Sequence, residues 1–385
     1  MTTRPVVIAG AGPAGLALGI GLLTRDQEVH LIERRSRATF LNDVGGAYEL
    51  TARTLEHLHS LGVLDAVRAR GTELTRFELR SLRGGVLQRL DFARGGFAVF
   101  AITRAALQGA LLERFEALGG RVTYEDHLSV VDVDGDRVHA SCQSGASFST
   151  GALVGADGVH SSVRRLVFDS APAIDVGIAA LWGRLDDDAF PVDRGHSVGL
   201  VGAGRSLVVA RAGTRERPRT LFTLCSSVDA SPLDRHAVFR TLPPQLAARL
   251  EQAHDVAETR LYAQPPLRSY VRGPVVLLGD AAHGMPPFLG LGANSAIEDA
   301  SLFAEALVND RASLAHLGRT RAALLNPRIA EARRLGAFMH SRGAIGSFAF
   351  NAITRLIPSA LVLWQLRALH TSPRTALPAG ATASR

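Results

Sequence analysis

A glycine-rich turn near the N-terminus has the spacing of a dinucleotide-phosphate site. Residues 10–15 read Gly-Ala-Gly-Pro-Ala-Gly and lie between an apolar stretch and an apolar helical pattern. In such a turn Gly10 permits the tight bend, Gly12 lets the backbone approach a pyrophosphate, and Gly15 allows close packing of helix on strand. The helix that starts at Pro13 and Ala14 then offers amide hydrogens and a partial positive charge to the phosphates. The alternative is a tight turn without a ligand.

An acidic residue follows this turn at the distance that a bound ribose requires. Glu33, about twenty residues on, ends the second apolar stretch and can accept hydrogen bonds from ribose hydroxyls, and we include its neighbour Arg34 in the site. The two features together predict a dinucleotide site. They do not separate NAD from FAD.

Two later segments each place an acidic residue after an apolar strand and before small residues. The first is the segment 155–164, which contains Asp157 and Gly158, and the second is the segment 279–283, which begins with Gly279 and Asp280. With the glycine turn they form three separate motifs. In this order they resemble the FAD-dependent aromatic hydroxylases typified by para-hydroxybenzoate hydroxylase, with salicylate, quinolone and urate hydroxylases as relatives. The resemblance covers essentially the whole chain.

The resemblance implies roles for individual residues. The Asp157-Gly158 segment corresponds to a motif that serves both FAD and NAD(P)H, and Asp280 corresponds to the carboxylate that bonds the ribityl chain of FAD. Arg104 is similar to an arginine near the phosphate and ribityl groups. The segment 285–294 is similar to the loop beside the flavin ring, whose backbone amides stabilise negative charge on the reduced ring. From this loop we assign to the cofactor site Pro287, Gly290, Gly292, Ala293 and Asn294.

The chain departs from these relatives at two places. Leu291 stands where relatives often have Gln or Lys, which matters little because the expected contacts come from the backbone. The loop 41–46 lacks an arginine that many relatives carry, so cofactor affinity or the docking of NAD(P)H is expected to differ. A second glycine-rich βαβ unit is absent from the sequence, and NAD(P)H is therefore expected to visit only transiently.

The implied reaction is a monooxygenation. NAD(P)H reduces FAD, oxygen adds at flavin C4a to give a hydroperoxide, and its distal oxygen passes to an electron-rich aromatic carbon of a small molecule. Epoxidation and Baeyer–Villiger oxygenation use the same chemistry, and a flavin oxidase or reductase would insert no oxygen. A flavin-dependent halogenase needs a lysine, and all 43 basic residues here are arginine. A non-enzymatic flavin-binding module is a further alternative.

The sequence assigns no catalytic acid or base. Tyr48, His57, His59 and His283 could carry protons, but a packed or solvated side chain is the ordinary interpretation of each. Aromatic walls for a planar substrate are expected at Trp182, Phe222 and Phe288.

The elements that must position these groups follow from the apolar patterns. Strands are expected at 5–9, 28–32 and 274–278, helices at 13–23, 104–118 and 293–308, a helical pattern over 53–70, and a hairpin turning at Asp134-Gly135. Short alternating stretches over 173–267 predict a mostly antiparallel sheet. The expected fold is α/β, with a Rossmann-like FAD-binding domain (1–72, 97–173 and 269–345) interleaved with a substrate domain (73–96 and 174–268), followed by a C-terminal apolar helix and flexible tail (346–385).

Composition narrows the partners. The net charge is +7, but the arginines are scattered and balanced by acidic residues, which argues against nucleic acid. Cys142 and Cys225 form neither a disulfide framework nor a metal-type spacing, so a reducing cytoplasm is expected and no metal site. The apolar segment 343–369 is interrupted by polar residues and predicts a packed helix rather than a membrane span. It also favours a lipophilic aromatic substrate, such as a quinolone or polyketide intermediate of secondary metabolism, and weak association with a membrane surface.

Overall fold

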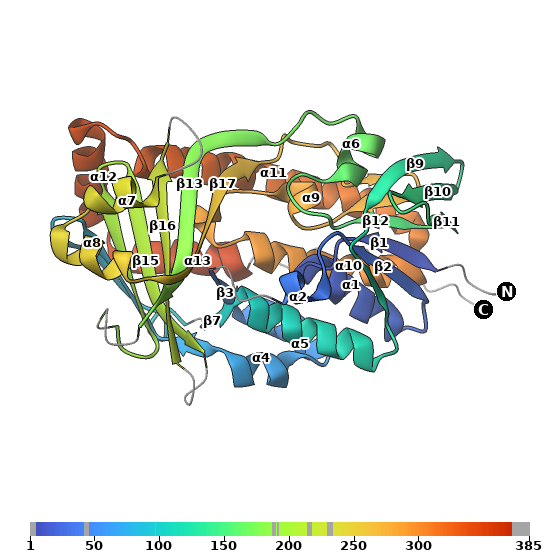
Figure 1. The fold of residues 1–385 in the computed structure, drawn as a ribbon, viewed down its shortest axis with the longest axis horizontal. Helices are drawn as coiled ribbons and strands as arrows, with labels where there is room; N and C mark the ends of the chain where they lie inside the picture. The colour runs from blue at the N-terminus through green and yellow to red at the C-terminus, as the bar shows by residue number, and fades with distance from the viewer. Residues whose placement is uncertain are drawn as a thin grey trace.

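The computed structural model describes residues 5–41, 46–96, 98–186, 190, 192–213, 218–228 and 234–371. Two large sheets lie at opposite ends of its long axis, and a small sheet containing β3 and β7 lies between them (Figure 1). The expected α/β class, with a Rossmann-like part and a largely antiparallel part, is confirmed. The division into two domains at the stated residue boundaries stays a prediction.

The N-terminal βαβ pattern forms the centre of a six-stranded sheet in the order β18-β19-β12-β1-β2-β8. All neighbours pair in parallel except β18 and β19. The strands are β1 (Val6–Ala9), β2 (Val29–Glu33), β8 (Val122–Tyr124), β12 (Leu153–Gly155), β18 (Val271–Arg272) and β19 (Val275–Leu277). Since β1 lies between β12 and β2, the glycine turn after β1 lies beside the ends of both neighbours. Ligands bind at this edge in open parallel sheets.

Helices cover this sheet on the side of its larger apolar core. Helix α1 (Pro13–Leu23) packs between α5 (Arg104–Ala117) and α10 (Gly292–Asn309), as the sequence predicted for all three. The helical pattern over 53–70 is divided into α3 (Ala52–Ser60) and α4 (Leu64–Arg70), because Gly62 takes a φ of +71° between them. The remaining short helices are α2 (Arg37–Phe40), α6 (Ser162–Phe168), α9 (Asp280–His283), and the 3-10 turns η1 (Pro287–Leu289) and η2 (Arg311–Ser313).

The second large sheet has seven strands in the order β17-β13-β16-β15-β14-β5-β6. Every pair is antiparallel except β14 with β5. Helices α7 (Arg235–Arg240) and α8 (Pro244–Glu251) cover its outer face. The strands are β5 (Arg76–Ser81), β6 (Val86–Asp91), β13 (Ile174–Leu185), β14 (His196–Gly202), β15 (Arg205–Gly213), β16 (Pro218–Ser227) and β17 (His254–Ala263).

Two small sheets complete the fold. One contains β3 (Ala47–Thr51), β7 (Val99–Thr103) and β4 (Thr72–Leu74), and it joins the two large sheets, since β7 and β4 also contact β15. The other contains β9 (Leu128–Asp134), β10 (Arg137–Cys142) and β11 (Ser147–Thr150), and β9 and β10 form the predicted hairpin.

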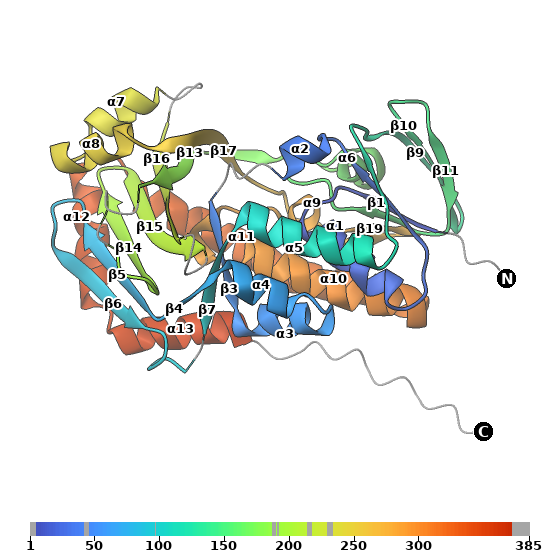
Figure 2. The same ribbon diagram turned by 60° about the horizontal axis from the view of Figure 1, so that its bottom comes forward.

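The C-terminal part of the chain consists of three helices: α11 (Leu314–Met339), α12 (Ala344–Leu356) and α13 (Ser359–Thr371). The expected single apolar helix is thus two helices, bent by 91° at the break before Ser359, where Pro358 cannot continue α12. Figure 2 shows α12 and α13 (red) at the end of the molecule that carries β5 and β6. Among the described residues, no single helix has the length and apolar composition of a membrane span, although the bent pair together does.

Candidate functional site

The glycine turn combines two tightly packed glycines with one that faces open space. A Cβ on Gly10 would lie 2.3 Å from the carbonyl oxygen of Ala156, and a Cβ on Gly15 would lie 2.0 Å from that of Gly10. No atom lies within 4 Å of the position that a Cβ on Gly12 would take. Gly12 also caps α1 without a side-chain hydrogen bond. The first amides of α1 therefore face a gap in which a phosphate group fits.

Glu33 lies next to this turn and is held in place by the chain itself. Its Oε2 accepts a hydrogen bond from the amide of Ala11 (3.0 Å), and its Oε1 accepts from the amide (3.0 Å) and Nε (2.8 Å) of Arg35. Burial alone would raise the pKa of Glu33, but the hydrogen bonds and charge of Arg35 outweigh it and hold the pKa below its usual range. The carboxylate is therefore charged at neutral pH.

Arg35, and not Arg34, is the arginine that contacts Glu33. Arg34 is exposed, whereas the guanidinium of Arg35 lies over the ring of Phe40, 4.9 Å from its centre. The sequence did not predict the role of Arg35, because two adjacent arginines follow the strand. Only the backbone turn after Glu33 determines which of the two reaches its carboxylate.

The segment around Asp280 meets the glycine turn directly. Gly279 has a φ of +56°, and a Cβ there would lie 3.0 Å from the Cβ of Ala14. Asp280 is exposed, although the five residues before it, 275–279, are all buried. Its carboxylate has no hydrogen-bond partner among the described residues. Burial raises the pKa of Tyr48, and the charges of Arg104, Asp280 and Arg35 also act on it. Three distant stretches thus place charged groups around one tyrosine.

Asp157 and Gly158 have a different local role. The Oδ2 of Asp157 accepts hydrogen bonds from the amides of Ser162 (2.7 Å) and Val163 (3.3 Å). It therefore satisfies the first amides of α6 together with the N-cap residue Ser161. Its Oδ1 is buried without a partner among the described residues, and burial raises its pKa. Gly158 has a φ of +83° and faces open space. A cofactor contact from this segment is accordingly expected from its backbone.

Arg164 is a buried residue of the site that the sequence did not reveal. Its guanidinium donates hydrogen bonds to the carbonyl oxygens of Ala281 (3.0 Å), Ala282 (2.9 Å) and Pro265 (2.5 Å), and burial lowers its pKa to about 10. It therefore joins the second motif to the third. The only signal was an arginine between Val163 and Val167 on a buried helix face.

The loop before α10 offers backbone amides to open space. Gly290 has a φ of +65°, and a Cβ on Gly290 or on Gly292 would meet no atom within 4 Å. The amides of Gly292, Ala293 and Asn294 open α10 and have no acceptor within the helix. Pro287 begins the 3-10 turn η1 that precedes them. This geometry supports the predicted stabilisation of a negatively charged ring through backbone groups.

The side chain of Asn294 is fully used within the protein. Its Oδ1 accepts hydrogen bonds from the amide of Thr51 (3.1 Å) and the hydroxyl of Thr54 (2.5 Å). Its Nδ2 donates to the carbonyl oxygens of Glu49 (2.9 Å) and Gly290 (2.7 Å). Asn294 thus ties β3 and α3 to the start of α10, and only its backbone amide is left for a cofactor.

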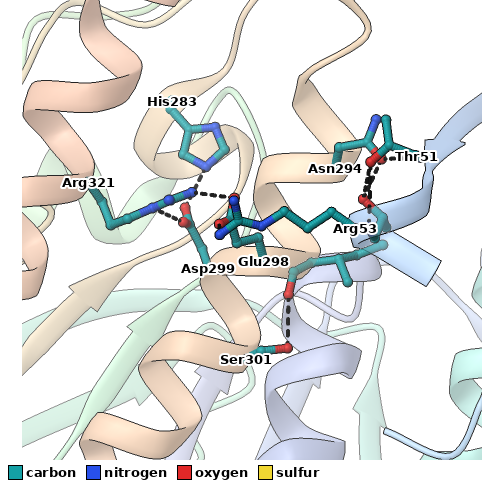
Figure 3. A network of polar contacts seen from close by, with 10 residues as sticks. Thr51, Arg53, His283, Asn294, Glu298, Asp299, Ser301 and Arg321 are labelled. Atoms are coloured by element: carbon teal, nitrogen blue, oxygen red, sulfur yellow. Dashed lines mark hydrogen bonds and ion pairs between the residues drawn. The ribbon is translucent and has the colours of Figure 1, made fainter. Parts of the chain in front are cut away.

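A buried network of ion pairs joins α9, α10 and α11 (Figure 3). Nε2 of His283 lies 2.9 Å from Oδ2 of Asp299, and Nε of Arg321 lies 2.5 Å from its Oδ1. Glu298 contacts both Arg321 and Arg53. His283 is fully buried, so it stabilises the packing of α9 on α10 and α11 rather than carrying protons to a substrate.

The three aromatic residues expected in the substrate pocket do not lie together. Trp182 and Phe288 belong to one apolar cluster on the face of the seven-stranded sheet towards η1. Phe222 is 1% exposed and lies on the opposite face, in the core beneath α7 and α8. Its assignment to the pocket is wrong, because neighbouring residues of a strand point to opposite faces and Thr223, not Phe222, faces inward. The site of Trp182 and Phe288 stays a prediction.

These residues fit FAD. Gly12, Gly158, Gly290 and Gly292 leave room that side chains would fill, and the exposed carboxylate of Asp280 is an acceptor beside that room. A Cβ on Gly279 would lie 3.0 Å from Ala14 of α1 and 3.5 Å from Ala296 of α10, so the Asp280 segment lies close to both helix starts. Among described residues, no group of three or more His, Cys, Asp or Glu side chains could hold a metal ion.

Comparisons with known proteins agree with this geometry. The FAD binding domain family matches residues 3–313. The chain is 30% identical over 346 residues to the 3-amino-4-hydroxybenzoate 2-monooxygenase PtnB3 of Streptomyces platensis, covering 80% of each chain. It is 30% identical over 312 residues to the 2-heptyl-3-hydroxy-4(1H)-quinolone synthase of Pseudomonas aeruginosa, covering 78% of this chain and 79% of that one. The crystal structure of Klebsiella pneumoniae HpxO with FAD and uric acid shares the fold, with a TM-score of 0.85 at 20% identity over 96% of this chain and 97% of that one. The chain belongs to the FAD-binding-domain family of flavoprotein monooxygenases.

Proposed function

We propose that this monooxygenase hydroxylates a neutral, lipophilic aromatic small molecule, with O2 and NAD(P)H as co-substrates. The observation that carries the proposal is that Gly279, next to Asp280, lies against both Ala14 of α1 and Ala296 of α10. Gly12, Gly290 and Gly292 each border open space, and the apolar cluster of Trp182 and Phe288 lies on the seven-stranded sheet. One relative, the 2-heptyl-3-hydroxy-4(1H)-quinolone synthase, has an alkyl-substituted quinolone in its name and so favours a lipophilic ring.

Each group of the site is assigned to one part of FAD. The amides of α1 bind the pyrophosphate across Gly12, Glu33 accepts from the ribose, and Asp280 accepts from the ribityl hydroxyls. The amides of Gly292 and Ala293 stabilise negative charge on the ring. FAD, when bound, supplies the redox chemistry with NAD(P)H and oxygen. The apolar side chains of Trp182 and Phe288 exclude water from the reacting edge.

The test is a substrate screen with the FAD-loaded enzyme. Candidate aromatics are added in the presence of NADH or NADPH, and nucleotide oxidation and product mass are followed under ¹⁸O₂. The proposal expects faster oxidation together with one labelled oxygen on an aromatic carbon. Labelled lactone or epoxide products would show Baeyer–Villiger oxygenation or epoxidation, and turnover without label would show an oxidase or reductase.

We also propose that the C-terminal helices associate weakly with an anionic membrane surface. Helix α12 exposes Ile345 (85%), Phe348 (74%) and Leu356 (80%), which lie on one face because they are three and eleven residues apart, about one and three turns. Helix α13 exposes Trp364 (64%). Large apolar side chains on one face of a helix are typical of helices that lie in a lipid interface.

The distribution of charge favours lipid over a second copy of the chain. The expectation that basic and acidic residues balance locally is wrong for the C-terminal part of the chain. Residues 332–385 contain seven arginines and no acidic residue, while the first 331 residues hold 36 arginines and 36 acidic residues. Two such segments would repel each other, whereas anionic lipid headgroups attract them. The buried, unpaired Cys142 and Cys225 support a reducing, cytoplasmic location for this surface.

Tryptophan fluorescence tests the membrane proposal, since Trp364 is the exposed one of the two tryptophans. Phosphatidylcholine vesicles containing phosphatidylglycerol should shift its emission to the blue and sediment the full-length holoenzyme, less so at high salt. Phe348→Ser with Leu356→Ser should weaken binding at least tenfold. Val130→Ser, an exposed valine on β9 at the other end of the molecule, is the matched control. Dimerisation without vesicle binding would overturn the proposal.

A further inference from the structure

Glu49 faces the seven-stranded sheet from the middle of β3. Its neighbours Tyr48 and Leu50 pack into the core of the FAD-binding side. Ala47 instead packs in a cluster with Ala212 of β15 and Leu221 of β16. Because side chains alternate along a strand, Glu49 lies on the same face as Ala47. The carboxyl thus points towards the sheet that carries Trp182.

The backbone of Glu49 is joined to the loop predicted to line the flavin ring. Nδ2 of Asn294 donates to the carbonyl oxygens of Glu49 (2.9 Å) and Gly290 (2.7 Å) at once. Gly290 and Gly292 border open space. Glu49 therefore lies where the ring-binding loop meets the substrate side.

The carboxyl of Glu49 has no partner among the described residues. It is exposed, although Leu50 and Thr51 beside it are buried, and the surrounding protein still raises its pKa by desolvation. The two observations together indicate a recess rather than an outer surface. Arg53, the next basic residue along the chain, pairs with Glu298. No arginine charge acts on Glu49 strongly enough to offset burial.

We propose that the Glu49 carboxylate recognises the substrate by accepting a hydrogen bond from an N–H or O–H group on a neutral aromatic ring. The inference rests on the proposed function and narrows its substrate class. A charged acceptor without a protein donor gains most from a ligand donor, since hydrogen bonds to charged groups are about twice as strong as neutral ones. The same charge disfavours an aromatic carboxylate at this position.

The experiment measures ligand binding to the FAD-loaded enzyme through changes in the flavin absorbance spectrum. The probes are 2-heptyl-4(1H)-quinolone, its N-methyl derivative and 3-amino-4-hydroxybenzoate. Glu49→Gln keeps the shape and removes the charge. Glu73→Gln is the matched control, because Glu73 is an exposed carboxylate on β4 of the same small sheet but on its other face.

Glu49→Gln should weaken binding of the N–H quinolone about tenfold, leave the N-methyl derivative unchanged, and tighten binding of the benzoate. Glu73→Gln should change none of the three. The inference is overturned if wild type does not bind the N–H quinolone, or if Glu49→Gln weakens both quinolones equally. Oxygen insertion in the substrate screen is scored separately, so the enzyme can prove to be a hydroxylase while Glu49 has no recognition role.

Discussion

Nε2 of His283 lies 2.9 Å from Oδ2 of Asp299, and neither side chain is exposed to solvent. Arg321 completes the group from α11. Since α9 begins at Asp280 and ends at His283, the network fixes the short helix whose first residue is predicted to hold the ribityl chain. A fully buried charge cluster here stabilises the position of an exposed functional carboxylate.

Removing the central carboxylate should strongly destabilise the protein. Asp299→Ala leaves His283 buried without its partner and leaves Arg321 with Glu298 alone. Breaking such a buried pair costs about 3–5 kcal/mol. Urea unfolding of the apoprotein measures this. Glu113→Ala, which removes an exposed ion pair with Arg70, should cost less than about 1 kcal/mol. Equal effects of the two substitutions would contradict the assigned role of the network.

The same carboxylate should make stability depend on pH in the acid range. Burial alone would raise the pKa of Asp299, but Arg321 and His283 outweigh it and hold the pKa below its usual range. Its contribution is therefore complete above the ordinary aspartate pKa of about 3.9 and is lost as pH falls through the lower folded value. Asp299→Asn should flatten this part of the acid slope in unfolding measured from about pH 2 to pH 7. An unchanged slope would show that other carboxylates carry it.

Substitutions of two glycines in the first turn should affect different properties, FAD binding in one case and stability in the other. Gly12→Val should fold, because a Cβ meets no atom there, but should weaken FAD binding at least a hundredfold by filling the pyrophosphate path. Gly15→Ala should instead lose stability, because its Cβ would lie 2.0 Å from the carbonyl oxygen of Gly10. Flavin fluorescence titration and thermal unfolding separate the two outcomes. A yellow, FAD-replete Gly12→Val protein would show that the pyrophosphate lies elsewhere.

Asp280 and Asp157 offer a second contrast between binding and structure. Asp280→Ala should release FAD with little change in the stability of the apoprotein, because the side chain is exposed and has no partner among the described residues. Asp157→Ala should cost about 0.5–2 kcal/mol, because the first two amides of α6 lose their acceptor. The measurements are FAD retention after dialysis and unfolding of the apoprotein. Full retention of FAD by Asp280→Ala would assign the ribityl contact to another group.

Substitutions of Phe222 and Trp182 should likewise separate an effect on stability from an effect on substrate binding. Phe222→Ala should cost about 3–5 kcal/mol, because it empties a core beneath α7 and α8, with little change in KM of the remaining folded enzyme. Trp182→Ala should raise KM for a lipophilic aromatic with a smaller loss of stability. Steady-state kinetics and urea unfolding of both variants decide this. A raised KM in Phe222→Ala alone would reverse the assignment of the two faces.

Local patterns predicted what depends on local geometry. The glycine turn, Glu33 and the strand before Asp280 could be found because turn, strand and helix follow one another along the chain. The face on which Phe222 points could not be found, since it depends on the pairing of β16 with two distant strands. Which of Arg34 and Arg35 contacts Glu33 depends on one turn of backbone. The hydrogen bonds of Arg164 and Asn294 could not be predicted either, because their partners lie more than a hundred positions away in the sequence. Glu49 gave no signal because its neighbours in sequence are ordinary strand residues.

The contact between Gly279 and Ala14 has a consequence for how the enzyme is made. The two residues are 265 positions apart, and β19, which leads to Gly279, is paired with β12 in the same sheet as β1. Most of the chain must therefore be synthesised before the predicted FAD site can form. A product that ends before α10 would therefore contain the glycine turn and Asp280 but lack the backbone amides of Gly292 and Ala293 that are predicted to support the ring.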